Sequence, residues 1–477
     1  MRLDEQLLKR AIPDASILYS TFPGDFQFSI DSRTLNKGDI FVALKGSTYD
    51  GHDFIQDVLD KGAAGLFIDV DKQDLLKKIN VSKLKNILVV VVSDVLNALY
   101  SLAKAWRSQF DYPVVAITGS IGKTSTKEIV KTVLDLHDEG KYLASHGNQN
   151  TQLGLALNIL RMRSKHKAAV FEVGVARRCQ MAQRSALLKP TIALITGIGH
   201  SHMEGLGSLA DIAFEKRDIF KYFSESNIGI VNGDLSVLSQ VAYMHPVVKF
   251  GSKTSNQVQI RKVHTGENSI NFVLKLYKQK YSIALENTHL GTVYNVAAAA
   301  AVAYLLDIPI KTIIKGVQTP IVVPGRFEQR FLPAKKGFLI NDCYNANPES
   351  MKSSLLAFQA LSTNAQKILV LGDMLELGSN SPFWHRQLGR FLRKVPSLSH
   401  VILVGDLVKW TKKTLPIGLT SDLVASWKEA ADLLQKRLAK HSVKNEAAVL
   451  VKGSRGIELD RLVENFSRSG IKEQHSG

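Results

Sequence analysis

The stretch Thr118–Lys127, TGSIGKTSTK, follows the short apolar run Val114–Ile117 and leads into a helical pattern. A strand therefore feeds a glycine-rich turn that opens a helix. The backbone amides freed by Gly119 and Gly122, together with the helix N-terminus, offer positive charge to phosphate oxygens. The ammonium group of Lys123 adds a full charge to the same place. The segment predicts a phosphate-binding loop and the use of ATP.

The hydroxyl groups of Thr124 and Ser125 follow the lysine and can reach a magnesium ion. The common phosphate-loop pattern places a further glycine at position 117, where this chain has Ile117. A Gly/Ser turn that caps an ordinary helix is therefore the structural alternative. A shortened Thr-Gly-x-x-Gly-Lys-Thr form is typical of one superfamily of ATP-dependent ligases. We expect ATP contacts from Thr118, Gly119, Ser120, Gly122, Lys123, Thr124 and Ser125.

Length and composition indicate a globular protein of two to four domains. The chain has 477 residues, of which 45% are apolar. Its two cysteines, Cys179 and Cys343, are far apart and have no metal-binding spacing, which fits a reducing compartment. The first ten residues mix both charge signs, so no secretory signal is visible. The apolar runs are too short to cross a bilayer, and we expect a cytoplasmic protein without membrane insertion.

The net charge of +18 favours an anionic partner. Nucleic acid, an acidic membrane surface and a charged small molecule all fit that sign. The basic residues are scattered along the chain, however, and form no basic block, zinc-finger spacing or aromatic-rich RNA-binding pattern. A substrate that carries several phosphates and carboxylates is therefore the partner that we expect, and we expect no nucleic acid.

The alternation of apolar runs and helical stretches predicts an α/β protein of three domains, at residues 1–110, 111–326 and 327–477. The first is a small α/β domain. The second has a mostly parallel sheet of the P-loop type with helices on both faces, and the third is a Rossmann-like α/β domain. In the last two domains, the expected strands are Val114–Ile117, Ala168–Glu172, Thr191–Thr196, Gly337–Asp342, Lys367–Gly372, His400–Gly405 and Ala447–Lys452.

Candidate magnesium ligands follow two neighbouring strands of the middle domain. One strand ends in Glu172, and the next leads to a turn that contains His200 and His202. In a P-loop sheet, these strand ends lie near the phosphates. A carboxylate and a neutral imidazole can complete magnesium coordination, although oxygen ligands usually dominate for this ion. Each residue alone is more often an ordinary polar strand end, but their joint position favours a metal site.

Several further segments occur in the order and spacing of a known family. The first third contains DSRTLNKGDIFVALKG and YDGHDF, and the centre contains GNQNTQLG and SHMEGLGSLADIAFEKRDIF. The last third contains PGRFE, NDCYNANPESM, LGDMLELG and VKGSRG. Over nearly its whole length, the sequence resembles the Mur ligase family. The pairing of YNANP with GDMLELG is similar to the member that adds D-alanyl-D-alanine to UDP-N-acetylmuramoyl-tripeptide in bacterial cell-wall synthesis.

The resemblance implies catalytic roles for four charged or titratable residues. Lys123 would hold the β- and γ-phosphates, and Thr124 would take part in magnesium binding. Glu172 and His202 would form a second metal position. Lys216 matches the lysine that this family carbamylates with carbon dioxide, which turns a cation into an anion able to hold magnesium. Without the family, a lysine on a helix is nearly always a solvated charge.

The resemblance also implies nucleotide and substrate contacts. Asn295 matches an adenine-contacting position, Arg326 a phosphate-contacting arginine supplied across a hinge at Pro324-Gly325-Arg326, and Asp342 a residue near the ribose. The turn after Asp342 would face the incoming dipeptide, whereas a simple Asn/Pro turn is the structural alternative. The expected substrate-binding residues are Ser32, Arg33, Lys45, Asp50, His52, Asn150, Tyr344, Asn345 and Asn347.

The implied reaction has two steps. The terminal carboxylate of the UDP-linked tripeptide attacks the γ-phosphate of ATP and forms an acyl phosphate, and the amine of D-alanyl-D-alanine then attacks that carbonyl carbon. The first step brings two anions together, so it requires the positive charges of Lys123, Arg326 and magnesium. We expect ATP and Mg²⁺ as cofactors, the two peptides as substrates, and a monomer.

The chain departs from the family pattern at positions inside the expected site. These departures weaken the expectation of nucleotide selectivity more than the expectation of activity. The third residue of the tripeptide and the carbamylation of Lys216 are not fixed by the sequence. The departures are Thr151, Ala176, Cys179-Gln180, Gly197, Thr292 and Asn341.

Three alternatives stay open at this stage. Another Mur-type or folylpolyglutamate-type amide ligase would share the ATP machinery, and a panel of acceptors would separate it. A nucleotide-binding homologue that has lost catalysis would bind ATP without turnover. A nucleic-acid-binding protein would show salt-dependent affinity for DNA or RNA that Lys123→Ala leaves intact.

Overall fold

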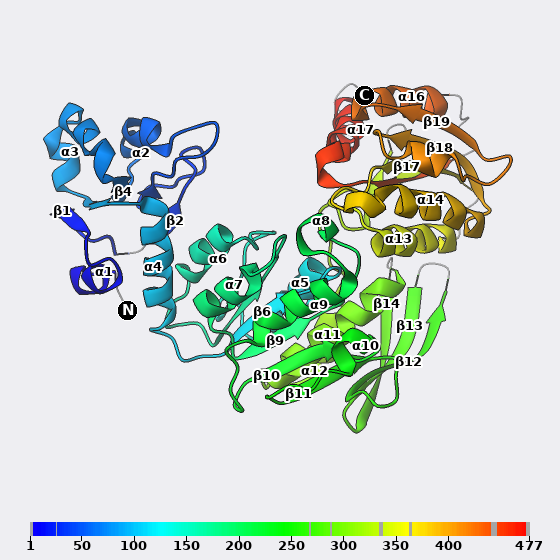
Figure 1. Ribbon diagram of the computed structural model, residues 1–477, viewed down its shortest axis with the longest axis horizontal. Coiled ribbons are helices and arrows are strands. Elements are labelled where there is room, and N and C mark those ends of the chain that lie inside the picture. Colours follow the sequence, from blue (N-terminus) through cyan, green and yellow to red (C-terminus); the bar gives the residue numbers. More distant parts are fainter. Residues whose placement is uncertain are drawn as a thin grey trace.

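The computed structural model describes residues 3–24, 26–266, 269–286, 289–332, 337–361, 365–439 and 446–473. These residues form three sheets that follow one another along the chain, each accompanied by helices. Figure 1 shows the first sheet at the left, the second in the centre and the third at the upper right. The expected α/β class with three sheet-based units is confirmed. The exact domain boundaries at residues 110 and 326 stay a prediction.

The first unit has a five-stranded sheet in the order β1-β5-β4-β3-β2. Its neighbouring strands are parallel except for β1, which runs antiparallel to β5 at the edge. The elements are α1 (Glu5–Ala11), β1 (Ser16–Ser20), β2 (Phe28–Ser29), β3 (Ile40–Val42), η1 (Gly51–Phe54), α2 (Ile55–Asp60), β4 (Gly65–Asp69), η2 (Val70–Lys78), α3 (Val81–Lys85), β5 (Leu88–Val92) and α4 (Val95–Arg107).

The second unit has a nine-stranded sheet in the order β14-β13-β12-β11-β10-β9-β6-β8-β7. Strands β7 to β12 and β6 pair in parallel, whereas β13 and β14 continue the sheet as an antiparallel extension that the sequence pattern did not predict. The elements up to β10 are β6 (Val114–Thr118), α5 (Lys123–His137), β7 (Tyr142–Ala144), α6 (Gln152–Ile159), β8 (Ala168–Glu172), α7 (Gln180–Leu188), β9 (Ile192–Ile195), α8 (Met203–Leu206), α9 (Leu209–Arg217), η3 (Asp218–Phe220) and β10 (Ile228–Asn232). The remaining elements are α10 (Ser236–Ser239), β11 (Val247–Gly251), β12 (Val258–Thr265), β13 (Ser269–Leu276), β14 (Gln279–Glu286), α11 (Leu290–Leu305) and α12 (Ile310–Gln318).

The central strands are apolar throughout because both faces of the sheet are covered. In β6, Val115 and Ile117 point into the core formed with α5, α11 and α12, whereas Val114 and Ala116 belong to the core on the opposite face. This alternation is the two-residue period of a strand with helices on both sides. The strands β8 and β9 flank β6, so the chain crosses to opposite sides at β6. Open α/β sheets bind ligands at such a switch point.

Small residues let the helices of one face approach α5 closely. Helix α11 contains the buried run Ala297–Ala301, which favours the helix and leaves little side-chain bulk. In α12, a Cβ atom on Gly316 would lie 2.8 Å from the Cα atom of Val133 in α5. The start of α5 is therefore fixed against its neighbours by packing, and with it the glycine-rich turn.

The third unit has a six-stranded sheet in the order β15-β16-β20-β17-β18-β19, parallel except for β15. The expected strands at 337–342, 367–372, 400–405 and 447–452 correspond to β16, β17, β18 and β20 within one or two residues. The elements are β15 (Glu328–Phe331), β16 (Gly337–Asn341), α13 (Pro348–Ala360), β17 (Gln366–Gly372), η5 (Gly378–Asn380), α14 (Ser381–Phe391), η6 (Leu392–Lys394), β18 (Leu398–Val404), α15 (Lys409–Lys412), β19 (Thr420–Val424), α16 (Trp427–Ala439), β20 (Ala447–Lys452), η7 (Arg455–Ile457) and α17 (Leu459–Glu473).

The first and second units share one hydrophobic core, which α4 connects. Trp106 of α4 is 1% exposed and packs with Phe26 of the first unit and Phe110, and its indole nitrogen donates to the carbonyl oxygen of Met162 at 3.1 Å. Arg163 donates to the carbonyl oxygen of Phe26 at 2.7 Å, and its guanidinium group lies over the rings of Phe26 and Trp106. Among the residues that the structure describes, no helix has the length and apolar character needed to cross a bilayer.

We expect Trp106→Ala to lower the free energy of unfolding by about 3–5 kcal/mol, because the change leaves a cavity where the two units join. Urea unfolding followed by far-ultraviolet circular dichroism measures this loss. Leu96→Ala is the control on the same helix, since Leu96 is 38% exposed, and its effect should stay within about 0.5 kcal/mol. Equal losses for the two variants would contradict a core that joins the units at Trp106.

Candidate active site

The glycine-rich turn between β6 and α5 has no space for side chains at its two glycines. Gly119 has φ of +150°, and a Cβ atom there would lie 2.0 Å from the hydroxyl oxygen of Thr196. Gly122 has φ of +83°, and a Cβ atom there would lie 2.3 Å from the side-chain oxygen of Asn295. Only glycine fits such positions without displacing neighbours. The turn is therefore a built backbone cradle at the N-terminus of the 15-residue helix α5.

Lys123 is the first residue of α5 and bends back over this turn. Its ammonium group donates to the carbonyl oxygen of Gly119 at 2.8 Å. Burial lowers the pKa of Lys123, the nearby Glu172 carboxylate opposes that shift, and the Arg326 guanidinium adds to it. The loop thus gathers positive charge where it meets Arg326, which lies in the hinge segment before β15.

Lys127 is a positioning residue that sequence reasoning missed. It is 1% exposed, and its ammonium group donates to the carbonyl oxygens of Ser145 and Gly147 at 2.9 and 3.1 Å. It also pairs with Glu128. These bonds tie the loop before Asn150 to the phosphate-loop helix. The signal was present in the sequence, since a lysine on the buried face of an amphipathic helix requires a polar partner.

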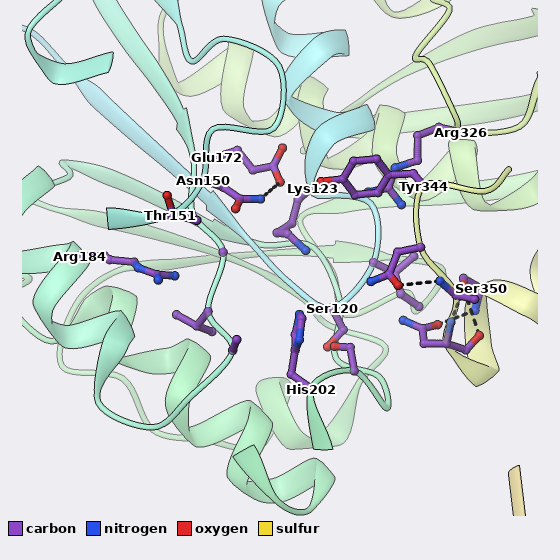
Figure 2. Close-up of a pocket in the computed structure, with 18 residues that line it drawn as sticks. Ser120, Lys123, Asn150, Thr151, Glu172, Arg184, His202, Arg326, Tyr344 and Ser350 are labelled. Atoms are coloured by element: carbon purple, nitrogen blue, oxygen red, sulfur yellow. Dashed lines mark hydrogen bonds between the residues drawn. The ribbon is translucent and has the colours of Figure 1, made fainter. Parts of the chain in front are cut away.

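The turn opens into a cavity of about 280 Å³ between the second and third units. Figure 2 shows Lys123 near its centre, with Glu172 and Asn150 above it and His202 below it. In the same view Arg184 projects from one side, while Arg326 and Tyr344 lie on the opposite side. The lining residues are Ser120, Ile121, Lys123, Asn150, Thr151, Glu172, Gly174, Val175, Ala176, Arg184, Ser201, His202, Arg326, Tyr344, Asn345, Ala346, Asn347 and Ser350.

Buried oxygen atoms without partners surround the phosphate loop. Among the described residues, the hydroxyl oxygens of Thr118, Thr124 and Ser201 and the Oε2 atom of Glu172 have no hydrogen-bond partner. The Oε1 atom of Glu172 is fixed by the amide of Asn150 at 2.7 Å. Buried polar atoms are rarely left unpaired in native proteins. Glu172 and Ser201 line this cavity, and Thr118 and Thr124 flank the glycine-rich turn, so these oxygens point to a ligand or a hard cation beside the turn.

The oxygen donors fit a magnesium ion that is held partly by phosphates. No group of three or more His, Cys, Asp or Glu side chains forms a ready metal site in the described part of the chain. Magnesium, however, is usually bound by one or two protein oxygens together with substrate phosphates and water. The Thr124 hydroxyl and the Glu172 carboxylate supply such oxygens.

Lys216 lies on α9, one residue beyond Glu215, and is 1% exposed. Burial lowers its pKa well below the usual value, and the positive charge of Lys123 lowers it further. Glu215 opposes that shift, but its carboxylate accepts from the backbone nitrogens of Cys179 and Met181 at 2.8 and 2.7 Å. Lys216 does not line the cavity itself. The environment favours its neutral amine.

Two histidines connect the second unit to the third. His202 has φ of +56°, and its Nδ1 atom lies 2.6 Å from the Oε2 atom of Glu376. The pairing lowers the pKa of Glu376. His200 contacts Glu349 through its backbone nitrogen, at 3.0 Å, and its ring. The LGDMLELG segment therefore reaches the turn that carries the expected metal histidine.

The expected dipeptide-facing residues lie on the third-unit side of the cavity. The Arg326 guanidinium carbon lies 4.0 Å from the centroid of the Tyr344 ring, and the Tyr344 hydroxyl accepts from Asn148 of the second unit at 2.5 Å. Asn345 lines the cavity. Asn347 lines it too, but its side chain caps α13 and accepts from the backbone nitrogen of Ser350 at 2.8 Å.

Asp342 forms a buried ion pair with Lys452. Its carboxylate lies 2.8 Å from the ammonium nitrogen of Lys452 and also accepts from the hydroxyl group of Ser354. Lys452 is 1% exposed and donates to the carbonyl oxygen of Asn345 at 3.1 Å. The Asp342–Lys452 pair thus holds the turn that carries Tyr344 and Asn345. Lys452 belongs to the VKGSRG segment, yet its role could not be read from the sequence alone.

A second cavity of about 480 Å³ meets the first at Arg326. Thr292 and Val296 of α11 line one part, and Phe327, Phe338 and Ile340 of the third unit line another. The lining mixes apolar side chains with polar ones such as Ser125, His289 and Thr292, and such a mixture can hold a flat heteroaromatic ring with polar edges. Asn295 does not line it; the Asn295 side chain contacts the phosphate loop and accepts from the hydroxyl group of Thr126 at 3.3 Å.

The expected nucleotide-sugar residues lie in the first unit, and none of them lines either cavity. Ser32 is buried, whereas Lys45 is exposed. Arg33 is exposed and pairs with Asp31 at 2.7 Å, which lowers the pKa of Asp31 to about 2. His52 is 2% exposed.

Both ring nitrogens of His52 contact other residues of the first unit. Its Nδ1 atom lies 2.6 Å from Asp50, and its Nε2 atom accepts from the backbone nitrogen of Asp69 at 3.0 Å. Asp50 also pairs with Lys72 at 3.3 Å. These contacts shape the loop beside Lys45. A contact with substrate stays a prediction for the five first-unit positions and for Asn150.

Three residues that depart from the family pattern, Thr151, Cys179 and Gln180, keep the local backbone in place. Cys179 has φ of +66°, a backbone conformation that glycine adopts most readily. The side-chain oxygen of Gln180 accepts from the backbone nitrogens of Ala176 and Arg177 at 2.9 and 3.2 Å, as a carboxylate could. Thr151 caps α6. The loop is therefore intact despite the changed residues.

Three family models match successive parts of the chain. The match to "Mur ligase family, catalytic domain" covers residues 27–107, the match to "Mur ligase middle domain" covers 117–303, and the match to "Mur ligase, glutamate ligase domain" covers 325–455. The chain belongs to the Mur ligase family. The matches meet near the ends of the three sheet-based units.

Individual relatives match over nearly the full length. The UDP-N-acetylmuramoyl-tripeptide–D-alanyl-D-alanine ligase of Bacillus subtilis is 32% identical, over 92% of this chain and 93% of the relative. A solved structure of the UDP-N-acetylmuramoylalanyl-D-glutamyl-2,6-diaminopimelate–D-alanyl-D-alanyl ligase of Acinetobacter baumannii has a TM-score of 0.78 at 26% identity, covering 98% of this chain and 99% of that one. The MurF ligase of Thermotoga maritima, solved in complex with ADP, has a TM-score of 0.75 at 26% identity and covers 94% and 98%.

We expect Gly119→Ala to weaken ATP binding by about 10-fold or more, because the added methyl group displaces Thr196 and distorts amides whose charge-assisted bonds are each worth about 1.5–3 kcal/mol. Isothermal titration calorimetry measures the affinity. Gly24→Ala is the control, since no atom lies within 4 Å of its added Cβ. Unchanged ATP affinity in Gly119→Ala would contradict phosphate binding at this turn.

Proposed function

We propose that this chain is the ATP-dependent ligase that joins D-alanyl-D-alanine to UDP-N-acetylmuramoyl-tripeptide in peptidoglycan synthesis. The observation that carries the proposal is a phosphate cradle at Gly119–Lys123 that opens into a cavity shared with the Tyr344–Asn347 turn. The similarity to ligases that are named for this activity, over nearly the full length of the chain, supports it. The bound ADP of one relative supports the use of ATP.

The phosphate loop and Arg326 would act on the triphosphate from two sides. The loop amides and Lys123 hold the β- and γ-phosphates, and Arg326 contributes charge from across the unit boundary. The substrate carboxylate then attacks the γ-phosphorus atom, and ADP leaves. Positive charge around the transferred group offsets the repulsion between the two anions. The second cavity suits the adenine ring, with Asn295 holding the loop below it.

Thr124, Glu172, His202 and carbamylated Lys216 would hold magnesium in this site. When bound, the metal supplies charge that stabilises the transferred phosphoryl group. The unpartnered oxygens of Thr124 and Glu172 support this assignment. For Lys216, carbamylation requires the neutral amine, which its burial favours.

The second step requires an acyl phosphate that is protected from water. The dipeptide amine attacks the acyl carbon, phosphate leaves, and the nitrogen loses a proton. Tyr344 and Asn345 line the cavity on the third-unit side, so a dipeptide held there would face the acyl group. The contacts of His200 with Glu349 and of His202 with Glu376 join the second and third units beside the cavity, and units held together in this way would limit the access of water.

We expect the purified protein with Mg-ATP to join D-alanyl-D-alanine to UDP-N-acetylmuramoyl-tripeptide and to release ADP and phosphate. Mass spectrometry of the nucleotide-linked product measures the reaction. A panel with single amino acids, glutamate and other UDP-muramoyl peptides serves as the control. Consumption of only another acceptor would assign the chain to a different amide ligase, and ATP binding without turnover would indicate a homologue that has lost catalysis.

We expect Lys216→Ala to lower turnover by at least about 100-fold, because the variant cannot form the carbamate anion that would hold magnesium. Short carboxylic acids added to the assay should restore part of the rate. Lys221→Ala is the matched control on an exposed lysine. Unchanged turnover in Lys216→Ala would remove this lysine from the mechanism.

Carbon-13 NMR of protein equilibrated with labelled bicarbonate provides a second readout for Lys216. The lowered pKa keeps the amine neutral at a lower pH than in an exposed lysine. The carbamate signal should therefore be present near neutral pH, decline as acidification protonates the amine, and be absent in Lys216→Ala. A signal that persists in the variant would come from another site.

A further inference from the structure

Arg184 is a buried cation that the reaction described above does not use. It lies on α7, lines the main cavity and is 8% exposed. Its Nη2 atom has a long contact of 3.4 Å with the side-chain oxygen of Gln180, and its Nε atom has no hydrogen-bond partner among the described residues. No carboxylate forms a salt bridge with it in the described part of the chain.

The acidic residue that acts on Arg184 electrostatically is already engaged. Glu215 opposes the lowering of the Arg184 pKa that burial causes, but both of its carboxylate oxygens accept from backbone nitrogens at the start of α7. Arginine does not lose its proton in proteins, so this charge cannot be removed by titration. A buried charge without a paired anion is costly, and a ligand anion would offset that cost.

The position of Arg184 separates it from the phosphate contacts. In Figure 2 it projects into the cavity from the side opposite Arg326 and Tyr344, with Lys123 between them. Helix α7 packs against α4, the helix that leads from the first unit, and Tyr100 of α4 lies within electrostatic range of Arg184. Arg184 therefore faces the side from which a substrate held by the first unit would enter.

We infer that Arg184 binds a carboxylate of the UDP-linked peptide substrate and thereby selects and positions that peptide. The inference rests on the proposed function and assigns Arg184 as the residue that recognises a carboxylate of the acyl substrate. A planar guanidinium with a free Nε matches a carboxylate in a two-point contact. The related ligase from Acinetobacter baumannii is named for a D-glutamyl-diaminopimelate peptide, which carries carboxylates besides the reacting one.

Arg184→Met and Arg184→Lys test the inference. Arg184→Met keeps the bulk of the side chain but removes the charge, and we expect the Kd of UDP-N-acetylmuramoyl-tripeptide, measured by calorimetry without ATP, to rise about 10- to 100-fold. Arg184→Lys keeps the charge without the planar fork and should give an intermediate loss. The KM values for ATP and for the dipeptide should change less than about 2-fold. Arg177→Met is the matched control, since Arg177 is exposed beside the same loop.

Substrate analogues identify the carboxylate and do not depend on the folding of a variant. The three analogues carry an amide at the glutamyl carboxylate, lysine in place of diaminopimelate, or an amide at the reacting terminus. For the analogue that lacks the partner of Arg184, wild-type affinity should fall, and Arg184→Met should cause no further loss. Losses that multiply for all three analogues would overturn the inference.

Two further outcomes separate this inference from its basis. An unchanged Kd in Arg184→Met with a lower turnover and a weaker carbamate signal would overturn it, because Arg184 would then act through Lys216, on which its charge also acts. Wild-type protein that binds the UDP-linked tripeptide but never joins the dipeptide would refute the proposed reaction and leave the binding comparison valid.

Discussion

The close packing of the Gly119–Lys123 turn is the constraint on which the rest of the site depends. Thr196, at the end of β9, and Asn295, on α11, occupy the space that side chains at Gly119 and Gly122 would need. Helix α11 can hold Asn295 there because its buried face consists largely of alanine. The sheet, the helix packing and the phosphate cradle are thus parts of one fitted arrangement. A displacement of any of them would move the backbone amides that we propose to face the phosphates.

Charge is the second organising feature of the cavity. Lys123, Arg184 and Arg326 are basic residues that line it, whereas Glu172 is the acidic residue that lines it. Such an excess suits a reaction whose participants are a triphosphate and a peptide acid. It also explains why Lys216 is driven towards its neutral form: the surrounding cations and the lack of solvent act in the same direction.

Much of the fold could be predicted from local patterns. The glycine-rich turn, the buried strands and the polar strand ends were visible because each reflects short-range chemistry that tertiary context did not override. The extension formed by β13 and β14 was missed, since these strands alternate buried and more exposed residues in a region where the parallel pattern was expected to continue. Within the site, Lys452 and Arg184 were missed because a basic residue is taken for a surface charge until its burial is known. Lys127 was missed although it lies on the apolar face of a helical pattern, where a lysine requires a polar partner. His202 and Glu376 lie 174 positions apart in the sequence, and no local pattern encodes their pairing.

The two junctions between units differ in kind. A continuous apolar core around Trp106 joins the first and second units, whereas the third meets the second largely through polar pairs such as Asn148 with Tyr344 and His200 with Glu349. Polar pairs exchange readily with water, while a shared core does not. Separation of the third unit from the second should therefore cost less free energy than separation of the first two units at Trp106. An inhibitor that binds at this polar junction and separates the two units would move the Tyr344–Asn347 turn away from the glycine-rich turn. It would block the reaction without competing with the nucleotide.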